Sequence, residues 1–252
     1  MISLIRNEIG KIIKRVDTRA LLLLSVWPLL LSVLVVVKDD VFKMEGDAIG
    51  AFEYTNYMVI IQNDIFLPLL LTVLIASVSL YQEVQKKTIY FYKDIARKDI
   101  LKAKYVSVFS MYFLFLFSYI LMSFASYYLA FCHHSMATGT FISYPTEVID
   151  MLYTAIQVIL GATLYIHVGI TFALRTSTGM TIFGTTMFYM FARIVPNFKF
   201  LKLVFPIGYK EVLEVTAHPY MCSLLLSLLV YAVYHAVIYY FNRRTFERMQ
   251  FN

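Results

Sequence analysis

A run of charged residues between two long apolar stretches is the part of this chain best suited to binding chemistry. From position 83 to 104 the sequence reads EVQKKTIYFYKDIARKDILKAK. Charge-assisted hydrogen bonds from such side chains suit a polar groove on a soluble partner. An ordinary positively charged loop between membrane spans has the same composition, and both interpretations stay open. The charged residues are Lys86, Lys87, Lys93, Arg97, Lys98, Lys102 and Lys104, with Glu83, Asp94 and Asp99.

The motifs of nucleotide hydrolysis and metal-dependent hydrolysis are missing from this sequence. Its one Gly-Lys pair, Gly10-Lys11, lacks the other residues of a phosphate-binding loop, and no His-Glu-x-x-His occurs. We therefore expect a chain that is not an enzyme and holds no cofactor of its own.

Six further residues have two interpretations each. His133 and His134 follow Cys132, but adjacent residues rarely converge on one metal ion, so a solvated loop is favoured and no metal site is predicted. His167 and His235 fall inside apolar stretches, where a hydrogen bond between helices is favoured over a functional site. Cys132 and Cys222 fall on the same predicted side, and free thiols are favoured over a disulfide.

The composition places these residues in an integral membrane protein. Sixty per cent of the residues are hydrophobic, 15% are charged, and the mean hydropathy is +0.70. A soluble domain of 252 residues could not cover that much apolar surface. The pI of about 9.1 then follows from positively charged cytoplasmic loops and predicts no nucleic-acid partner.

Six stretches are long or apolar enough to cross a bilayer, and we expect one all-α membrane domain over residues 1–252. Helices are expected because lipid offers no hydrogen-bond partner to backbone N–H and C=O groups. About 20 helical residues cross the ~30 Å of hydrocarbon. The predicted spans are 20–37, 65–81, 105–131, 151–174, 178–192 and 220–241.

The charge distribution orients these spans. With both termini inside, the inside segments 1–19, 82–104, 175–177 and 242–252 carry 16 basic and 6 acidic residues, a net charge of +10. The outside segments 38–64, 132–150 and 193–219 carry 6 basic and 10 acidic residues, a net charge of −4. The positive-inside rule therefore predicts cytoplasmic termini.

Two segments outside the spans have patterns of their own. Apolar residues of 2–16 recur on one stripe at 100° per residue, which predicts an amphipathic helix on the inner leaflet. Residues 193–219 alternate short apolar stretches with Pro196, Pro206 and Pro219. We expect a re-entrant helical segment there, on the extracellular side, with a miscounted span as the alternative.

Aromatic residues in the third span suggest a path for substrate. Tyr112, Phe115 and Tyr119 follow i, i+3, i+7 spacing and share one helix face. They could line a hydrophobic path for an amphipathic molecule, although core packing produces the same spacing.

The whole pattern resembles the ABC-2-type permeases of bacterial ABC transporters. That family has six spans, an amphipathic N-terminal helix, a coupling helix after span two and a re-entrant stretch before span six. Glu83, Thr88, Arg97 and Lys104 fall at positions of the family's local motif. Lys87 stands where glycine is usual and Asp94 where proline is usual.

The resemblance implies a permease in the bacterial plasma membrane. Two permease subunits, identical or different, would pair with ATP-binding subunits that hold ATP and Mg²⁺. The coupling residues would be Glu83, Lys86, Lys87, Thr88, Lys93, Asp94, Arg97, Lys98 and Lys104. The short chain is similar to permeases that export phenol-soluble modulins or confer lantibiotic immunity, which implies amphipathic peptide substrates. Lipid-linked polysaccharide export is the alternative within the family, and a secondary transporter or channel is the rival from another class.

Overall fold

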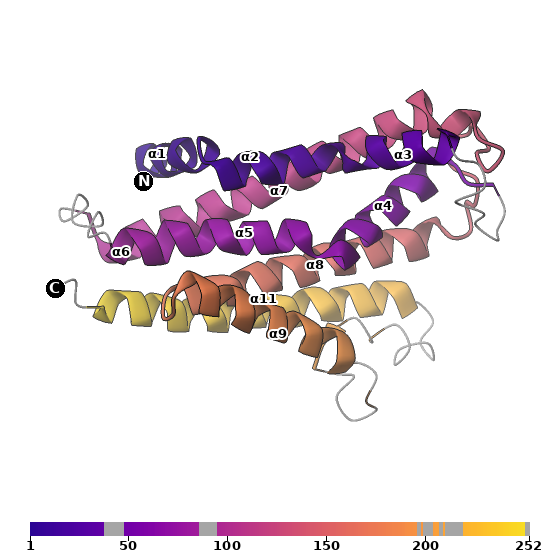
Figure 1. Ribbon diagram of the computed structural model, residues 1–252. Helices are drawn as coiled ribbons and strands as arrows, with labels where there is room; N and C mark the ends of the chain where they lie inside the picture. Colours follow the sequence, from indigo (N-terminus) through magenta and orange to yellow (C-terminus); the bar gives the residue numbers. More distant parts are fainter. Residues whose placement is uncertain are drawn as a thin grey trace.

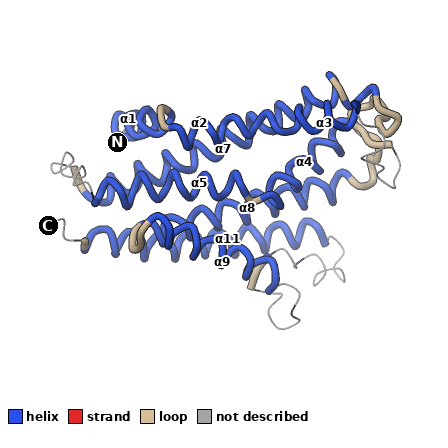
Figure 2. The backbone as a smooth tube through the Cα atoms, in the orientation of Figure 1, coloured by secondary structure: helices blue, strands red, loops and turns tan. Residues whose placement is uncertain are grey.

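The computed structural model describes residues 1–37, 48–85, 95–195, 198, 204–206, 209 and 219–249. Over these residues the chain forms an elongated helical bundle without strands, and the described loops lie mainly at its two ends (Figures 1 and 2). The α-helices are α1 (Ile2–Ile13), α2 (Val16–Leu23), α3 (Trp27–Val37), α4 (Ala51–Ile65), α5 (Leu67–Ser77), α6 (Glu83–Gln85), α7 (Arg97–Leu129), α8 (Val148–Ala173), α9 (Thr178–Ile194) and α11 (Pro219–Arg248).

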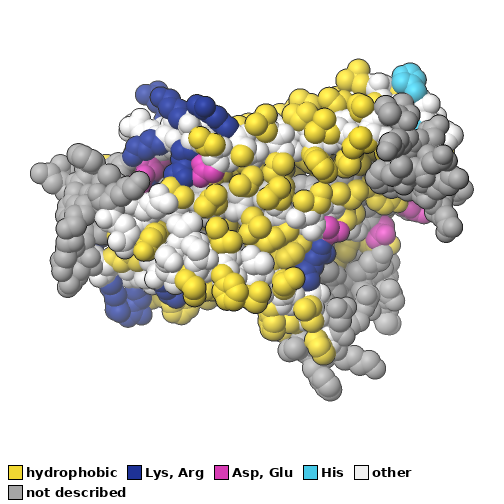
Figure 3. Space-filling view, viewed as in Figure 1, with side chains coloured by type: hydrophobic (Ala, Val, Ile, Leu, Met, Phe, Trp, Pro, Cys, Tyr) yellow, Lys and Arg dark blue, Asp and Glu magenta, His cyan; other side chains and the backbone are white. Residues whose placement is uncertain are grey.

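Five helical stretches among the described residues are long and apolar enough to cross a membrane. They are Val16–Val35, Leu67–Gln85, Arg97–His133, Val148–Ala173 and Tyr220–Arg248. Each overlaps one predicted span, so the prediction of an all-helical, multi-pass membrane protein is confirmed. Most of the Lys and Arg side chains visible in Figure 3 lie at the end of the bundle that carries both termini.

The predicted span 178–192 coincides with α9, which has 17 residues. At 1.5 Å per residue this helix is about 25 Å long, somewhat less than the ~30 Å of hydrocarbon. Figure 1 shows α9 leading away from the end that carries the termini. Its side chains Met180, Phe183 and Met187 are exposed, as expected of a surface that faces lipid. The sixth crossing remains a prediction.

Helix α4 lies in a segment where the sequence predicts no helix. Residues 38–64 were expected to form an outside loop, but α4 occupies residues 51 to 65 and packs against α7 and α8. That expectation is wrong for the second half of the segment. The physical reason is that Glu53, Asn56 and Gln62 are buried between helices, while a hydropathy average treats them as surface residues.

The chain bends between α4 and α5 at a single residue, and both helices run toward the end of the bundle that carries the termini (Figure 1). Phe66 has a φ of 63°, which a non-glycine residue seldom adopts, and α5 begins directly after it. Its ring stacks on Tyr189 of α9 with 4.2 Å between centroids. This packing holds the turn between α4 and α5 against α9.

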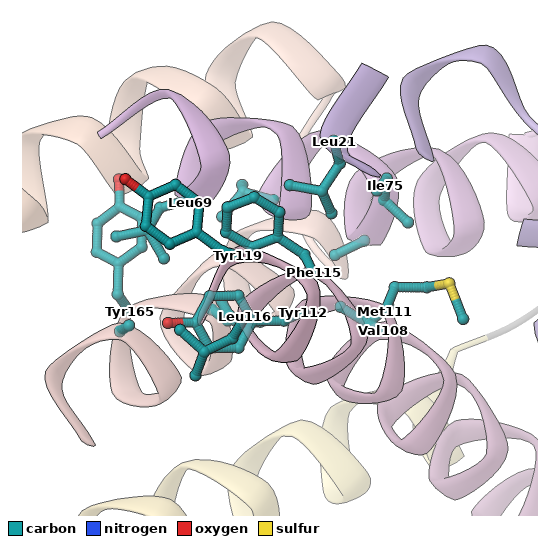
Figure 4. Close-up of a cluster of buried hydrophobic side chains, with 14 of the residues drawn as sticks. Leu21, Leu69, Ile75, Val108, Met111, Tyr112, Phe115, Leu116, Tyr119 and Tyr165 are labelled. Atoms are coloured by element: carbon teal, nitrogen blue, oxygen red, sulfur yellow. The ribbon is translucent and has the colours of Figure 1, made fainter. Parts of the chain in front are cut away.

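The centre of the bundle is a packed cluster of apolar and aromatic side chains (Figure 4). Leu69, Val73, Val108, Phe115 and Ile166 are fully buried. Inside a membrane, close packing of such groups holds helices together, because lipid tails are as apolar as the side chains themselves. The core therefore joins α5, α7 and α8.

Candidate functional site

A buried lysine joins three helices at the end of the bundle that carries the termini. Lys104, on α7, is 1% exposed. Its ammonium group donates hydrogen bonds to Glu83 Oε2 at 2.7 Å, to Glu8 Oε2 at 3.1 Å and to the Ser79 carbonyl oxygen at 2.8 Å. Glu8 is 2% exposed and also accepts a bond from Lys11 Nζ at 3.1 Å. We call these four charged residues, Lys11, Glu8, Lys104 and Glu83, the ion cluster.

The local structure explains how these groups meet. Helix α1 packs along α7. Its residues Leu4, Glu8 and Ile12 lie one turn apart on the same helix face, and all three are buried. Between α5 and α6 the chain forms a short π-helix over Val78–Gln82, which contains Ser79. Short π-helices are frequent at functional sites. The two carboxylates and two ammonium groups balance in charge, which makes the burial of Glu8 and Lys104 tolerable.

Arg97 connects the first turn of α7 to the C-terminal end of α11. Its Nη1 donates to the carbonyl oxygens of Glu247 at 2.8 Å and Met249 at 2.7 Å. Carbonyl groups at the end of a helix lack partners within the helix and carry partial negative charge, so a guanidinium group suits them. The ion cluster and Arg97 together tie α7 to both ends of the chain.

The structure describes four of the nine residues predicted to couple to a partner. Arg97 and Lys98 lie at the exposed start of α7, and Glu83 begins α6. Lys86, Lys87, Thr88, Lys93 and Asp94 lie outside the described residues, as does most of the predicted coupling helix. Lys104 does not lie in a loop between spans, because two carboxylates and a carbonyl oxygen surround its ammonium group inside the bundle.

Sequence reasoning missed Glu8. The signal was present, since Glu8 follows Leu4 and precedes Ile12 at four-residue intervals, the spacing of one helix face. The predicted stripe of isoleucines faces partly outward instead, with Ile2 84% exposed. The predicted amphipathic helix over 2–16 thus appears as α1, while its contact with the inner leaflet remains a prediction.

The residues proposed to line a substrate path lie in the packed core. Tyr112, Phe115 and Tyr119 are each at most 1% exposed and belong to the cluster in Figure 4. The Tyr119 hydroxyl donates to the Met58 carbonyl oxygen at 3.1 Å. Tyr119 also lines a cavity of about 80 Å³ beside α3 and α4. Core packing, the alternative explanation of their spacing, accounts for all three side chains.

The structure also places the two histidines and the two cysteines of the apolar stretches and their ends. The Nδ1 atoms of His167 on α8 and His235 on α11 lie 2.7 Å apart, which confirms the predicted hydrogen bond between helices. Cys132 and Cys222 are free thiols. Among the described residues, no group of three His, Cys, Asp or Glu side chains is arranged to hold a metal ion.

The helical fold and its five long apolar helices among the described residues indicate an α-helical, multi-pass membrane protein. Comparison of the chain with protein-family models, with curated proteins and with solved structures found no match.

Proposed function

We propose that this chain is the transmembrane subunit of an ATP-driven exporter of the ABC-2 type. The observation that carries the proposal is the network around the α6–α7 connection. Glu83 precedes that connection, Arg97 follows it, and both are bonded to other helices. A partner that moves the connection would therefore also move α1, α7 and α11.

The network suits transmission of force. Lys104 contacts α1 and the π-helix before α6 within a single set of short hydrogen bonds. Breaking a buried, charge-assisted bond costs several kcal/mol, so these helices are expected to move as one unit. Lys98 is exposed beside Arg97 and is available to an acidic groove on an ATP-binding subunit.

ATP and Mg²⁺ belong to that partner in this proposal. The permease supplies the membrane path, and two copies, or one copy and a related chain, form the complex. The bacterial plasma membrane with cytoplasmic termini is the proposed location. Amphipathic peptides are the proposed substrates, and lipid-linked polysaccharide is the alternative.

Co-expression with an ATP-binding subunit, chosen as the product of a neighbouring reading frame that carries a phosphate-binding loop, tests the proposal. We expect a complex that survives detergent extraction and hydrolyses ATP, whereas the isolated chain does not. ATP turnover by the isolated chain, or no association with the ATPase, would overturn it.

Charge reversals sharpen this test. Arg97→Glu and Glu83→Lys each disrupt a bonded group next to the connection, and both are expected to insert normally but to lose substrate-stimulated ATP hydrolysis. Lys102→Glu is the matched control, because Lys102 is exposed on the same helix and exposed charges contribute under about 1 kcal/mol. If all three variants transport like the wild type, the connection has no coupling role.

A proton-coupled secondary transporter is the second candidate function. The observation that favours it is the bonded pair His167–His235 inside the bundle, because ionisable groups within spans often mark proton pathways. Transport into vesicles driven by a pH gradient without ATP, and abolished by His167→Asn, would select this candidate over the exporter.

A further inference from the structure

A second site lies apart from the ion cluster, between α4, α8, α9 and α11. Side chains of these helices enclose a cavity of about 340 Å³. Small-molecule sites usually measure ~300–1,000 Å³, so this cavity is large enough for a compact ligand. Six of the lining side chains are aromatic: Tyr153, Tyr165, Phe188, Tyr189, Phe205 and Tyr231.

These rings already form edge-to-face pairs, an arrangement that aromatic side chains favour. Tyr165 and Tyr189 meet edge to face with centroids 5.3 Å apart, and Phe188 and Phe205 do so at 6.0 Å. A flat ring entering the cavity could continue the same pattern of edge and face contacts. The lining therefore favours an aromatic ligand over a flexible aliphatic chain.

Gln157, in the lining, has a buried polar atom that calls for a hydrogen-bond donor. Gln157 is 4% exposed, and its Nε2 donates to Ser227 Oγ of α11 at 2.7 Å. Its Oε1 has no hydrogen-bond partner within the described part of the chain. A buried carbonyl oxygen without a partner is unfavourable, so a ligand N–H or O–H placed there would satisfy it.

Two other features shape the site. Gly161 of α8 leaves room, since a Cβ atom at this position would meet only the Tyr231 hydroxyl, at 3.6 Å. At the rim, Arg193 forms an ion pair with Asp64, and both side chains are about half exposed. The cavity thus has an aromatic interior and a charged edge.

We propose that this cavity binds a small amphipathic molecule of one to three aromatic rings that carries a hydrogen-bond donor. The rings pack among the aromatic side chains, and the donor reaches Gln157 Oε1. In an exporter, the cavity serves as a subsite for the ring of an amphipathic substrate, and in that respect alone the inference rests on the proposed function.

Fluorescence titration of the full chain in lipid nanodiscs tests the binding. The probe is phenylnaphthylamine, which is neutral, has two aromatic groups joined by an N–H donor, and brightens in apolar surroundings. We expect a saturable signal with one probe per chain above the signal of empty nanodiscs. A linear rise equal to that of empty nanodiscs would overturn the proposal.

Variants that fill the cavity locate the site. Gly161→Leu from α8 and Ala192→Phe from α9 each place a side chain into the space, so we expect binding at least about tenfold weaker, equivalent to ~1.4 kcal/mol. Gly161→Ala adds only the Cβ atom that the structure accommodates, and it should bind within about twofold of the wild type. If both filling variants melt cooperatively and bind like the wild type, the probe binds elsewhere.

Gln157→Met tests the donor. The variant should weaken phenylnaphthylamine about fivefold, the value of one ordinary hydrogen bond, and leave phenylnaphthalene, which lacks the N–H, unchanged. An equal loss for both probes would overturn the role of Gln157. These measurements need no ATPase, so a failure here is distinct from a failure of the exporter proposal.

Discussion

At the scale of single residues, Lys104 is the most informative side chain. It lies seven residues past the exposed Arg97 on the same helix, yet its ammonium group is buried among Glu8, Glu83 and Ser79. A lysine is rarely buried unless it is paired, so its environment is a specific feature of this fold. Lys104 therefore adds to the positive charge of the predicted cytoplasmic segments and also joins helices inside the bundle.

Removing the Lys104 ammonium should destabilise the protein strongly. Lys104→Met removes the ammonium group that Glu8 and Glu83 share, and breaking a buried ion pair in this way costs about 3–5 kcal/mol. We expect a clear fall in the melting temperature in detergent. The exposed residue Lys98 supplies the control, since Lys98→Met should change stability by less than about 0.5 kcal/mol.

A double variant separates charge from packing at this site. Glu8→Gln together with Lys104→Met also removes the buried carboxylate that Lys104 bonds, and should recover part of the loss, as a double-mutant cycle would record. Equal melting temperatures for Lys104→Met and Lys98→Met would contradict the buried ion cluster.

At the scale of elements, the contact between α5 and α8 depends on one glycine. A Cβ atom at Gly169 would lie 2.7 Å from Val73 Cγ2, closer than real contacts allow. Gly169→Ala is therefore expected to destabilise the protein by ~1–3 kcal/mol through overpacking. Gly161→Ala, on the same helix but beside the cavity, should be neutral or stabilising by up to about 1 kcal/mol.

Thermal unfolding of both glycine variants checks this prediction. Adding Val73→Ala to Gly169→Ala should restore stability, because it removes the methyl groups that clash. If Gly169→Ala and Gly161→Ala melt alike, α5 and α8 do not approach as closely as the structure shows.

The C-terminal end of α11 should depend on Arg97. Arg97→Ala removes both bonds to the Glu247 and Met249 carbonyls, so we expect faster hydrogen exchange of the amides at positions 245–249. Global stability should change by less than about 1 kcal/mol, because this guanidinium is exposed. Unchanged exchange at these amides, measured beside a Lys98→Ala control, would show that the contact does not hold the helix end.

At the scale of the whole molecule, the number of crossings follows from where the termini lie. Both termini lie at one end of the bundle (Figure 1), and an odd number of crossings would place them at opposite ends. Five helical stretches can cross, so we expect α9 to provide the sixth crossing in spite of its length. Local thinning of the bilayer accommodates a helix a few ångströms short.

Cysteine labelling tests this topology. In a chain with Cys132 and Cys222 replaced by serine, single cysteines at Lys98 and Arg244 should react only from the cytoplasm. Cysteines at Glu147 and Phe198 should react only from outside, and the net charges of +10 and −4 supply the orientation. Labelling of the Phe198 position from the cytoplasm would show that α9 does not cross.

The membrane class, the helical fold and the general placement of five spans are determined by the sequence itself. A long apolar run in lipid forms a helix, because the helix satisfies every backbone hydrogen bond within the run. Hydropathy and loop charge are sums over neighbouring residues, so both can be read from the sequence. The N-terminal helix follows from local periodicity in the same way.

Only the tertiary structure decided which polar residues lie inside the bundle. Glu8 and Lys104 are 96 positions apart, and Gln157 and Ser227 are 70 apart, so no local pattern records that they meet. The same holds for α4, whose polar residues look like a loop until α7 and α8 cover them. Burial of a polar group depends on the partner that packing brings to it, and packing is a property of the whole fold.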